Sequence, residues 1–263
     1  MKKIIFYFSG TGNSLKTAKE LKKLINTDEL LSIPQALKNN SFTFDADIIV
    51  IVFPVYVWGP PQIVAEFCSK LKIANTANYI FSVATYGGFS GNPHRIINKK
   101  LEAENLKLAA SFNVRMPGNY TPLYGAPSEK KQNKLFSKAE LKIRKIADYI
   151  NARKTGTFEG NNLFSNYIMS SLIYNAGIKQ MSKKAADFFA NEKCNGCGLC
   201  ARICPVNNIR IENNKPVWAL NCEQCMICLQ WCPTEAVELG KLTRGRRRYR
   251  HPDCSINDIM KIK

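Results

Sequence analysis

The chain has 263 residues, of which 45% are hydrophobic and 22% charged, as is usual for a globular protein that buries a core. Its 38 Lys and Arg against 20 Asp and Glu give a formal net charge of +18. No apolar stretch approaches the roughly 20 residues that span a bilayer, so no membrane span is expected.

The amino terminus begins with a short apolar run. Residues 4–8 are apolar, and the Ser9-Gly10-Thr11-Gly12 that follows lacks the small-residue pattern of a cleavage site. We therefore expect a buried first strand instead of an export signal, and a cytoplasmic protein.

Strand and helix patterns alternate over the first 150 residues. Runs rich in β-branched residues, typical of strands covered on both faces, alternate with segments of helical periodicity. This alternation predicts an α/β fold, a doubly wound parallel sheet with helices on both faces. The expected strands are residues 4–8, 47–53, 79–84 and 107–114, and the expected helices are residues 12–24, 61–71, 93–104 and 128–152. The last helix carries apolar residues at Leu135, Ala139, Leu141, Ile143, Ile146 and Ile150.

The loop after the first strand predicts an anion site. Glycines, hydroxyls and the free amides of a helix start together form a cradle for a phosphate. Leu15 stands where a dinucleotide fingerprint needs its third glycine, and the same residue breaks a Walker loop. A hydroxyl-rich loop suits a flavin monophosphate, and a simple capped turn is the alternative. The candidate residues are Ser9, Gly10, Thr11, Gly12, Asn13 and Ser14.

Two aromatic loops follow later strands of the expected sheet. In a doubly wound sheet, ligands bind at the carboxyl ends of the strands. Trp58 or Tyr56 from one loop and Tyr86 from the other are expected to sandwich an isoalloxazine ring. The candidate flavin-binding residues are Pro54, Tyr56, Trp58 and Gly59 in the first loop, and Thr85, Tyr86, Gly87 and Gly88 in the second.

Ten cysteines are present, and eight of them form two runs that each end in Cys-Pro. The spacing is that of bacterial iron–sulfur runs, whose fourth cysteine ligates the other cluster. Zinc is the weaker alternative for these two runs. Outside them, Cys68 is expected to be a buried, inert thiol, and Cys254 an ordinary residue of the tail. One cluster is then held by Cys194, Cys197, Cys200 and Cys232, and the other by Cys222, Cys225, Cys228 and Cys204.

These motifs together resemble a known family. Residues 1–152 resemble flavodoxin through the Ser9–Ser14 loop and the two aromatic loops, and residues 185–240 resemble a bacterial two-cluster ferredoxin. With the Arg-Tyr-x-His-Pro element of residues 248–252, the chain is similar to the ferredoxin-fused flavodoxin proteins of anaerobic bacteria and archaea. The resemblance implies FMN, two [4Fe–4S] clusters and the sheet order 2-1-3-4-5.

Four segments are expected. A flavodoxin-like FMN-binding domain at 1–152 precedes a helical connector at 153–184, with an apolar helix over 163–181. A small α+β ferredoxin-like domain at 185–240 precedes a basic tail at 241–263. The tail is either a solvated charge run or a segment that folds back to join the two domains.

Clusters pass single electrons and FMN exchanges one or two, so we expect an electron carrier that relays electrons between them. The alternative is a flavin-dependent reductase of a small substrate, with residues 115–124 building a pocket over the flavin. Typical flavodoxins and ferredoxins are acidic, whereas this chain is basic. The positive charge is either that of a solvated, Lys-rich surface or one that steers an acidic redox partner, a ferredoxin or a reductase, which we expect by charge complementarity; nucleic acid is not expected.

Overall fold

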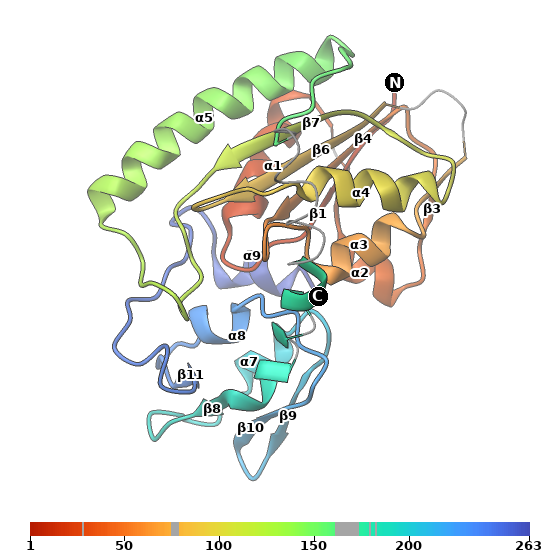
Figure 1. Ribbon diagram of the computed structural model, residues 1–263. Helices are drawn as coiled ribbons and strands as arrows, with labels where there is room; N and C mark the ends of the chain where they lie inside the picture. The colour runs from red at the N-terminus through yellow and green to blue at the C-terminus, as the bar shows by residue number, and fades with distance from the viewer. Residues whose placement is uncertain (28, 75–78, 161–173, 179, 182) are drawn as a thin grey trace.

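The computed structural model describes residues 1–263 except 28, 75–78, 161–173, 179 and 182. The expected connecting helix at 163–181 therefore lies largely outside the described residues. Around it, residues 174–178 and 180–181 are helical. Figure 1 shows a layered α/β domain above a smaller cysteine-rich domain, with the long helix α5 across the top.

The first domain is a five-stranded parallel sheet of order β2-β1-β4-β6-β7. Counted in the order of these strands along the chain, this is 2-1-3-4-5, so the expected flavodoxin-like fold is confirmed. β4 is buried along its whole length, as its unbroken apolar run predicted. The strands are β1 (Lys3–Tyr7), β2 (Glu29–Ser32), β4 (Ile48–Pro54), β6 (Tyr79–Tyr86) and β7 (Leu108–Arg115), and the short strands β3 (Thr43–Phe44) and β5 (Lys72–Ile73) pair separately.

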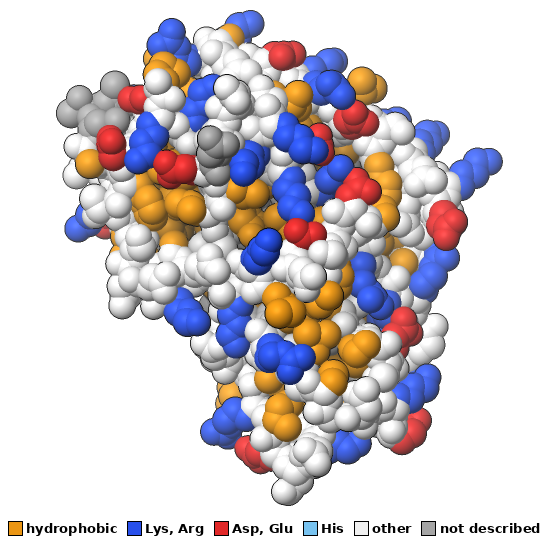
Figure 2. Space-filling view, turned by 180° about the vertical axis from the view of Figure 1, so that it is seen from behind, with side chains coloured by type: hydrophobic (Ala, Val, Ile, Leu, Met, Phe, Trp, Pro, Cys, Tyr) orange, Lys and Arg blue, Asp and Glu red, His pale blue; other side chains and the backbone are white. Residues whose placement is uncertain are grey.

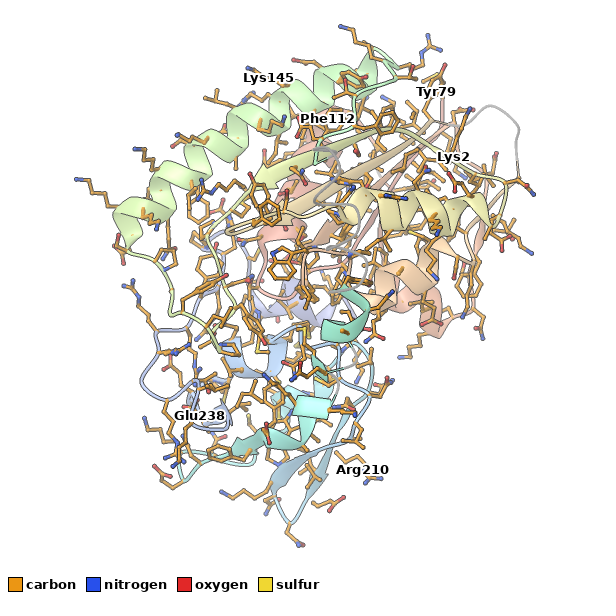
Figure 3. The ribbon with its side chains drawn as sticks, viewed as in Figure 1. Lys2, Tyr79, Phe112, Lys145, Arg210 and Glu238 are labelled. Carbon is orange, nitrogen blue, oxygen red and sulfur yellow. The ribbon has the colours of Figure 1, made fainter. Side chains whose placement is uncertain are left out.

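Helices cover both faces of the sheet. α1 (Asn13–Leu24) contacts α5 (Glu129–Asn151) on one face, and α3 (Gln62–Cys68) contacts α4 (Pro93–Glu102) and α2 (Ile33–Lys38) on the other. In Figure 3, Phe112 of β7 lies beneath α5 and Lys145 points away from the sheet. The buried stripe of α5 is Ala139, Ile143, Ile146, Ala147 and Ile150. Leu141, which the apolar pattern had included, is 64% exposed because it lies off this stripe.

The cysteine-rich domain is built from two similar halves. Each half places a single-turn helix between its cysteines, α7 (Leu199–Arg202) and α8 (Ile227–Gln230). The 3₁₀ helix η1 (Lys184–Asp187) leads into β8 (Phe188–Ala190), which pairs with β11 (Val237–Leu239), and β9 (Ile209–Glu212) pairs with β10 (Lys215–Trp218). In Figure 1 this domain lies at the carboxyl ends of the sheet strands, opposite the N-terminus.

The final segment returns to the first domain. Its helix α9 (Ile256–Met260) docks beside α1, where Lys19 Nζ lies 2.6 Å from Asp258 Oδ1. The core of the sheet continues into Ile227 and Trp231 of the cysteine-rich domain and into Ile259 of α9. Within the described part of the chain, no helix is long and apolar enough to cross a membrane.

Candidate functional site

The loop between β1 and α1 is buried and presents free helix amides. Ser9 and Ser14 are each 1% exposed, and Gly12 adopts φ 101°, a left-handed conformation that favours glycine. The Gly12 N–H donates to Ser9 Oγ at 3.2 Å. The first-turn amides of Asn13 and Ser14 have no acceptor among the described residues. Free amides at the start of a helix attract an anion, so this loop fits a phosphate group.

The aromatic loops open onto one cavity of about 420 Å³ at the carboxyl ends of β4 and β6. This volume falls in the usual range for a small-molecule site, about 300–1,000 Å³. Thr85 in its wall connects to the loop between β1 and α1, since Thr85 Oγ1 lies 2.7 Å from Ser14 Oγ. The sequence-predicted flavin residues that line the cavity are Asn13, Pro54, Tyr56, Trp58, Thr85, Tyr86, Gly87 and Gly88.

The first aromatic loop is held in an unusual backbone conformation. Val57 and Trp58 adopt φ 47° and 61°, values that a β-branched residue such as Val57 rarely takes. Gly59 lies outside the cavity lining: it exchanges hydrogen bonds of 2.8 and 2.9 Å with the Tyr56 backbone. A Cβ at Gly59 would lie 2.3 Å from the Tyr174 ring, so this glycine is needed for packing.

The C-terminal tail packs against the loop between β1 and α1, residues 9–14, which we call the phosphate loop. The His251 N–H donates to Thr11 O at 2.8 Å, and the Tyr249 hydroxyl donates to Asn13 Oδ1 at 2.6 Å. A Cβ on Gly12 would lie 2.8 Å from His251 Cβ and 3.0 Å from Cys254 Cβ. The tail therefore forms the outer wall of the loop. Burial raises the pKa of Cys254 to about 11, so its thiol stays protonated.

Several basic residues of the tail are bound to other parts of the chain. Arg246 donates to Thr121 O at 2.7 Å. Arg248 is 3.0 Å from Glu238, and both side chains are almost fully buried. Figure 3 labels Glu238 on β11, in the cysteine-rich domain. The segment thus folds back across both domains, as one of the two interpretations of the sequence proposed.

A hydrogen-bonded chain links the cysteine-rich domain to the same loop. Gln230 Nε2 donates to Asn119 O at 2.9 Å and to Thr121 Oγ1 at 2.7 Å. Gln230 Oε1 accepts from the Tyr249 N–H at 2.7 Å, and Trp231 Nε1 donates to Gly10 O at 3.0 Å. The phosphate loop is therefore fixed from three sides, by its own domain, by α8 and by the tail.

The cysteines predicted for one cluster surround a single small cavity. Its wall contains Cys204, Cys222, Cys225 and Cys228. Burial raises the pKa of Cys225 well above its ordinary value, and the neighbouring Cys222, Cys204 and Cys228 thiols act in the same direction. Buried thiolates need a compensating positive charge, which a bound metal centre supplies.

The other predicted set lies nearer the surface. Burial raises the pKa of Cys200 to about 11, and Cys232, Cys197 and Cys194 add to the effect through their proximity. Cys197 is exposed. One set therefore contains two buried cysteines, Cys204 and Cys228, whereas the other contains the exposed Cys197, and the ligand assignments stay predictions. All ten cysteines are free.

Backbone and side-chain N–H groups face the cysteine sulfurs. The amides of Asn208, Gln224 and Ala236 donate to Cys204, Cys222 and Cys232 Sγ at 3.2, 3.3 and 3.3 Å. Trp218 Nε1 is buried and lines the same cavity as Cys228, where its N–H acts to lower the pKa of the Cys228 thiol against the effect of burial. Such donors stabilise the negative charge of an iron–sulfur cluster.

The donor chemistry fits the expected cofactors. Four thiols per set suit a [4Fe–4S] cluster, and free amides beside an aromatic-lined cavity suit FMN. Within residues 1–263, apart from the gaps given above, no three or more His, Cys, Asp or Glu side chains are close enough to hold a single metal ion, which, unlike a four-iron cluster, needs all its ligands around one atom.

The cavity includes residues that were not among the predicted flavin-binding residues. The segment 115–124 contributes Asn119, Tyr120, Leu123 and Tyr124, where a pocket had been expected only in the alternative function. The cysteine-rich domain adds Gln224, Cys225 and Met226, and further wall residues are Phe89, Gly177, Gln180, Met181 and Lys184. Only Gln224 and Met226 carried a signal in the sequence, because the equivalent residues of the first cysteine run are glycines.

Comparisons with known proteins match both halves of the chain. Residues 4–139 match the flavodoxin domain family, and residues 189–210 match the 4Fe-4S binding domain family. A ferredoxin of Methanothermococcus thermolithotrophicus is 38% identical over 50 residues, which is 18% of this chain and 83% of that ferredoxin.

Two solved structures each match more than half of the chain at low sequence identity. The flavodoxin of Fusobacterium nucleatum bound to flavin mononucleotide is 14% identical, with a TM-score of 0.39, over 59% of this chain and 100% of that one. Rubredoxin oxygen:oxidoreductase of Desulfovibrio gigas is 17% identical, with a TM-score of 0.36, over 58% of this chain. The chain spans only 36% of the length of that oxidoreductase.

Proposed function

Since the chain belongs to the flavodoxin family and continues into a ferredoxin-related 4Fe-4S domain, we propose that it relays single electrons between two [4Fe–4S] clusters and one FMN. The two domain families make it an electron-transfer flavoprotein. The proposal adds the number of clusters, the identity of the flavin and the order of transfer. FMN, when bound, exchanges one or two electrons and so matches one-electron clusters to other acceptors.

One observation carries the proposal: Cys225 lines both the flavin-sized cavity and the cavity of the buried cysteine set. A cluster held there is separated from the flavin site only by Cys225 and Met226, since Met226 also lines both cavities. The carbonyl of Cys225 also touches the phosphate loop, since a Cβ on Gly10 would lie 2.4 Å from its oxygen. The buried set is therefore the inner cluster of the relay.

The exposed set is the entry point for electrons from outside. Cys197 lies at the surface, and Arg202 Nη1 donates to its carbonyl at 2.9 Å. Lys193 is exposed nearby in sequence, and the chain carries a net charge of +18. Figure 2 shows Lys and Arg side chains spread across one face of the molecule, with acidic side chains interspersed among them. An acidic redox protein is the partner that such a surface attracts.

A flavin-dependent reductase of a small substrate is the second candidate. Phe89 and Leu123, 58% and 71% exposed, line the flavin-sized cavity, and Tyr120 and Tyr124 line it from the same loop as Leu123. An apolar, partly covered mouth suits a small acceptor better than a large protein surface. Steady-state reduction of small acceptors by the loaded protein, absent when FMN is omitted, would favour this candidate over the pure carrier.

The experiment that tests the proposal is quantification of iron, sulfide and FMN in anaerobically purified protein. We expect about eight iron atoms and one FMN per chain. Cys228→Ala and Cys197→Ala should each lose about one cluster, while Cys68→Ala, a buried thiol in α3, should lose none. A chain with one cluster, or with zinc in place of iron, would contradict the proposal.

A further inference from the structure

The two cysteine runs share one backbone conformation around their second cysteine. In the first run, Gly196 and Gly198 flank Cys197 with φ 72° and 67°. In the second run, Gln224 and Met226 flank Cys225 with φ 52° and 60°. Both loops therefore need a left-handed backbone conformation at the same two positions.

Glycine suits these places and larger residues do not. The left-handed region crowds the Cβ of an L-residue, which is why glycine is found there. The first run follows this rule twice, and the second run breaks it twice. Because backbone strain of this kind persists where a function requires it, the two side chains are expected to make contacts that glycine cannot.

Both exceptional side chains line the flavin-sized cavity, where Tyr56 and Tyr86 also lie. Gln224 is 2% exposed and Met226 is 3% exposed. The Gln224 amide oxygen and nitrogen are both buried, and neither has a hydrogen-bond partner in the protein. A buried primary amide with no partner is costly, so the side chain is prepared for a ligand that both donates and accepts.

We propose that Gln224, with Met226 beside it, is a flavin-binding residue that the cluster domain supplies to the FMN site. The polar edge of the isoalloxazine ring carries an N–H between two carbonyls, and a primary amide offers both an acceptor and donors to match it. Met226 supplies a flexible apolar contact to the ring. This inference rests on the proposed function, because it assumes that FMN occupies the cavity. It adds that the loop of the inner cluster itself holds the flavin.

Two substitutions test the inference on the full chain with its clusters in place. Gln224→Leu keeps the size of the side chain and removes both polar groups. Gln224→Gly copies Gly196 and relieves the backbone. Both should raise the FMN dissociation constant about tenfold, the loss expected for a buried polar pair. Iron content and the cluster EPR signals should stay at the level of the unsubstituted protein.

A matched control separates flavin binding from backbone effects. Asn207→Gly also replaces a left-handed residue, φ 51°, in the same domain, but Asn207 is exposed and does not line the cavity. It should leave the FMN dissociation constant unchanged. If Gln224 has only a structural role, Gln224→Gly should leave the FMN dissociation constant unchanged. An unchanged FMN dissociation constant in both Gln224 variants would overturn this inference but not the proposed function. An unsubstituted chain that binds no FMN would overturn the proposed function as well.

Discussion

Removing the Tyr249 hydroxyl is expected to loosen the phosphate loop from the tail. This hydroxyl donates to Asn13 Oδ1 at 2.6 Å, and both residues are buried. Tyr249→Phe leaves the oxygen of the buried Asn13 side chain without its donor, which costs about 1–3 kcal/mol of unfolding free energy. At about 2–4 °C per kcal/mol for a chain of this size, Tm should fall by roughly 2–12 °C.

The assay is anaerobic thermal unfolding followed by circular dichroism, on preparations with equal iron and FMN contents and at one scan rate. Because Asn13 begins the helix whose free amides would bind the flavin phosphate, the FMN dissociation constant should also rise several-fold. Tyr79→Phe is the control, since the Tyr79 hydroxyl has no hydrogen bond to the described residues and lies at the far end of the sheet (Figure 3). Equal Tm values for the two variants would refute the reasoning.

Three further predictions concern Trp218, the two histidines and Gly12. Trp218→Phe removes the buried N–H beside the inner cysteine set and should lower the reduction potential of one cluster only; an EPR-monitored titration that shows no change would contradict that role. Burial lowers the pKa of both His94 and His251 to about 4, so each stays neutral when folded while its unfolded form protonates. The unfolding free energy should therefore fall as pH drops from about 6.5 toward 4, by about 1 kcal/mol per histidine at pH 5.5, and His251→Gln should remove about half of that dependence. Gly12→Ala forces a Cβ to 2.8 Å from His251 at φ 101° and should weaken FMN binding and lower Tm, whereas Gly88→Ala, with no atom within 4 Å, should leave Tm unchanged.

Local sequence patterns predicted the parts of the structure that depend on neighbouring residues. The apolar run of β4 specified a strand covered on both faces, and the cysteine spacing grouped Cys204 with Cys222, Cys225 and Cys228. Both follow from short-range geometry, because a strand is defined by consecutive residues and a cluster loop by a fixed spacing.

The arrangement of the domains could not be predicted in this way. The bond from Trp231 Nε1 to Gly10 O joins residues far apart in the sequence, and so does the bond from the His251 N–H to Thr11 O. No local pattern marks either pair. The packing of Tyr174 against Gly59 is another such contact, because nothing near Gly59 in the sequence reveals it. The equivalence of Gln224 in the second cysteine run and Gly196 in the first is visible in the sequence. That Gln224 lines the flavin-sized cavity is visible only in the structure.

The central claim is that electrons pass between the inner cluster and the flavin across the Cys225 loop, and rapid mixing tests it directly. Anaerobic protein carrying both clusters and FMN is mixed with a one-electron donor, and cluster and flavin absorbance are followed together. We expect the clusters to be reduced first and the flavin to follow at a rate independent of donor concentration. In Cys228→Ala, which lacks the inner cluster, that flavin phase should slow at least tenfold. Flavin reduction at the same rate in both proteins would contradict the relay.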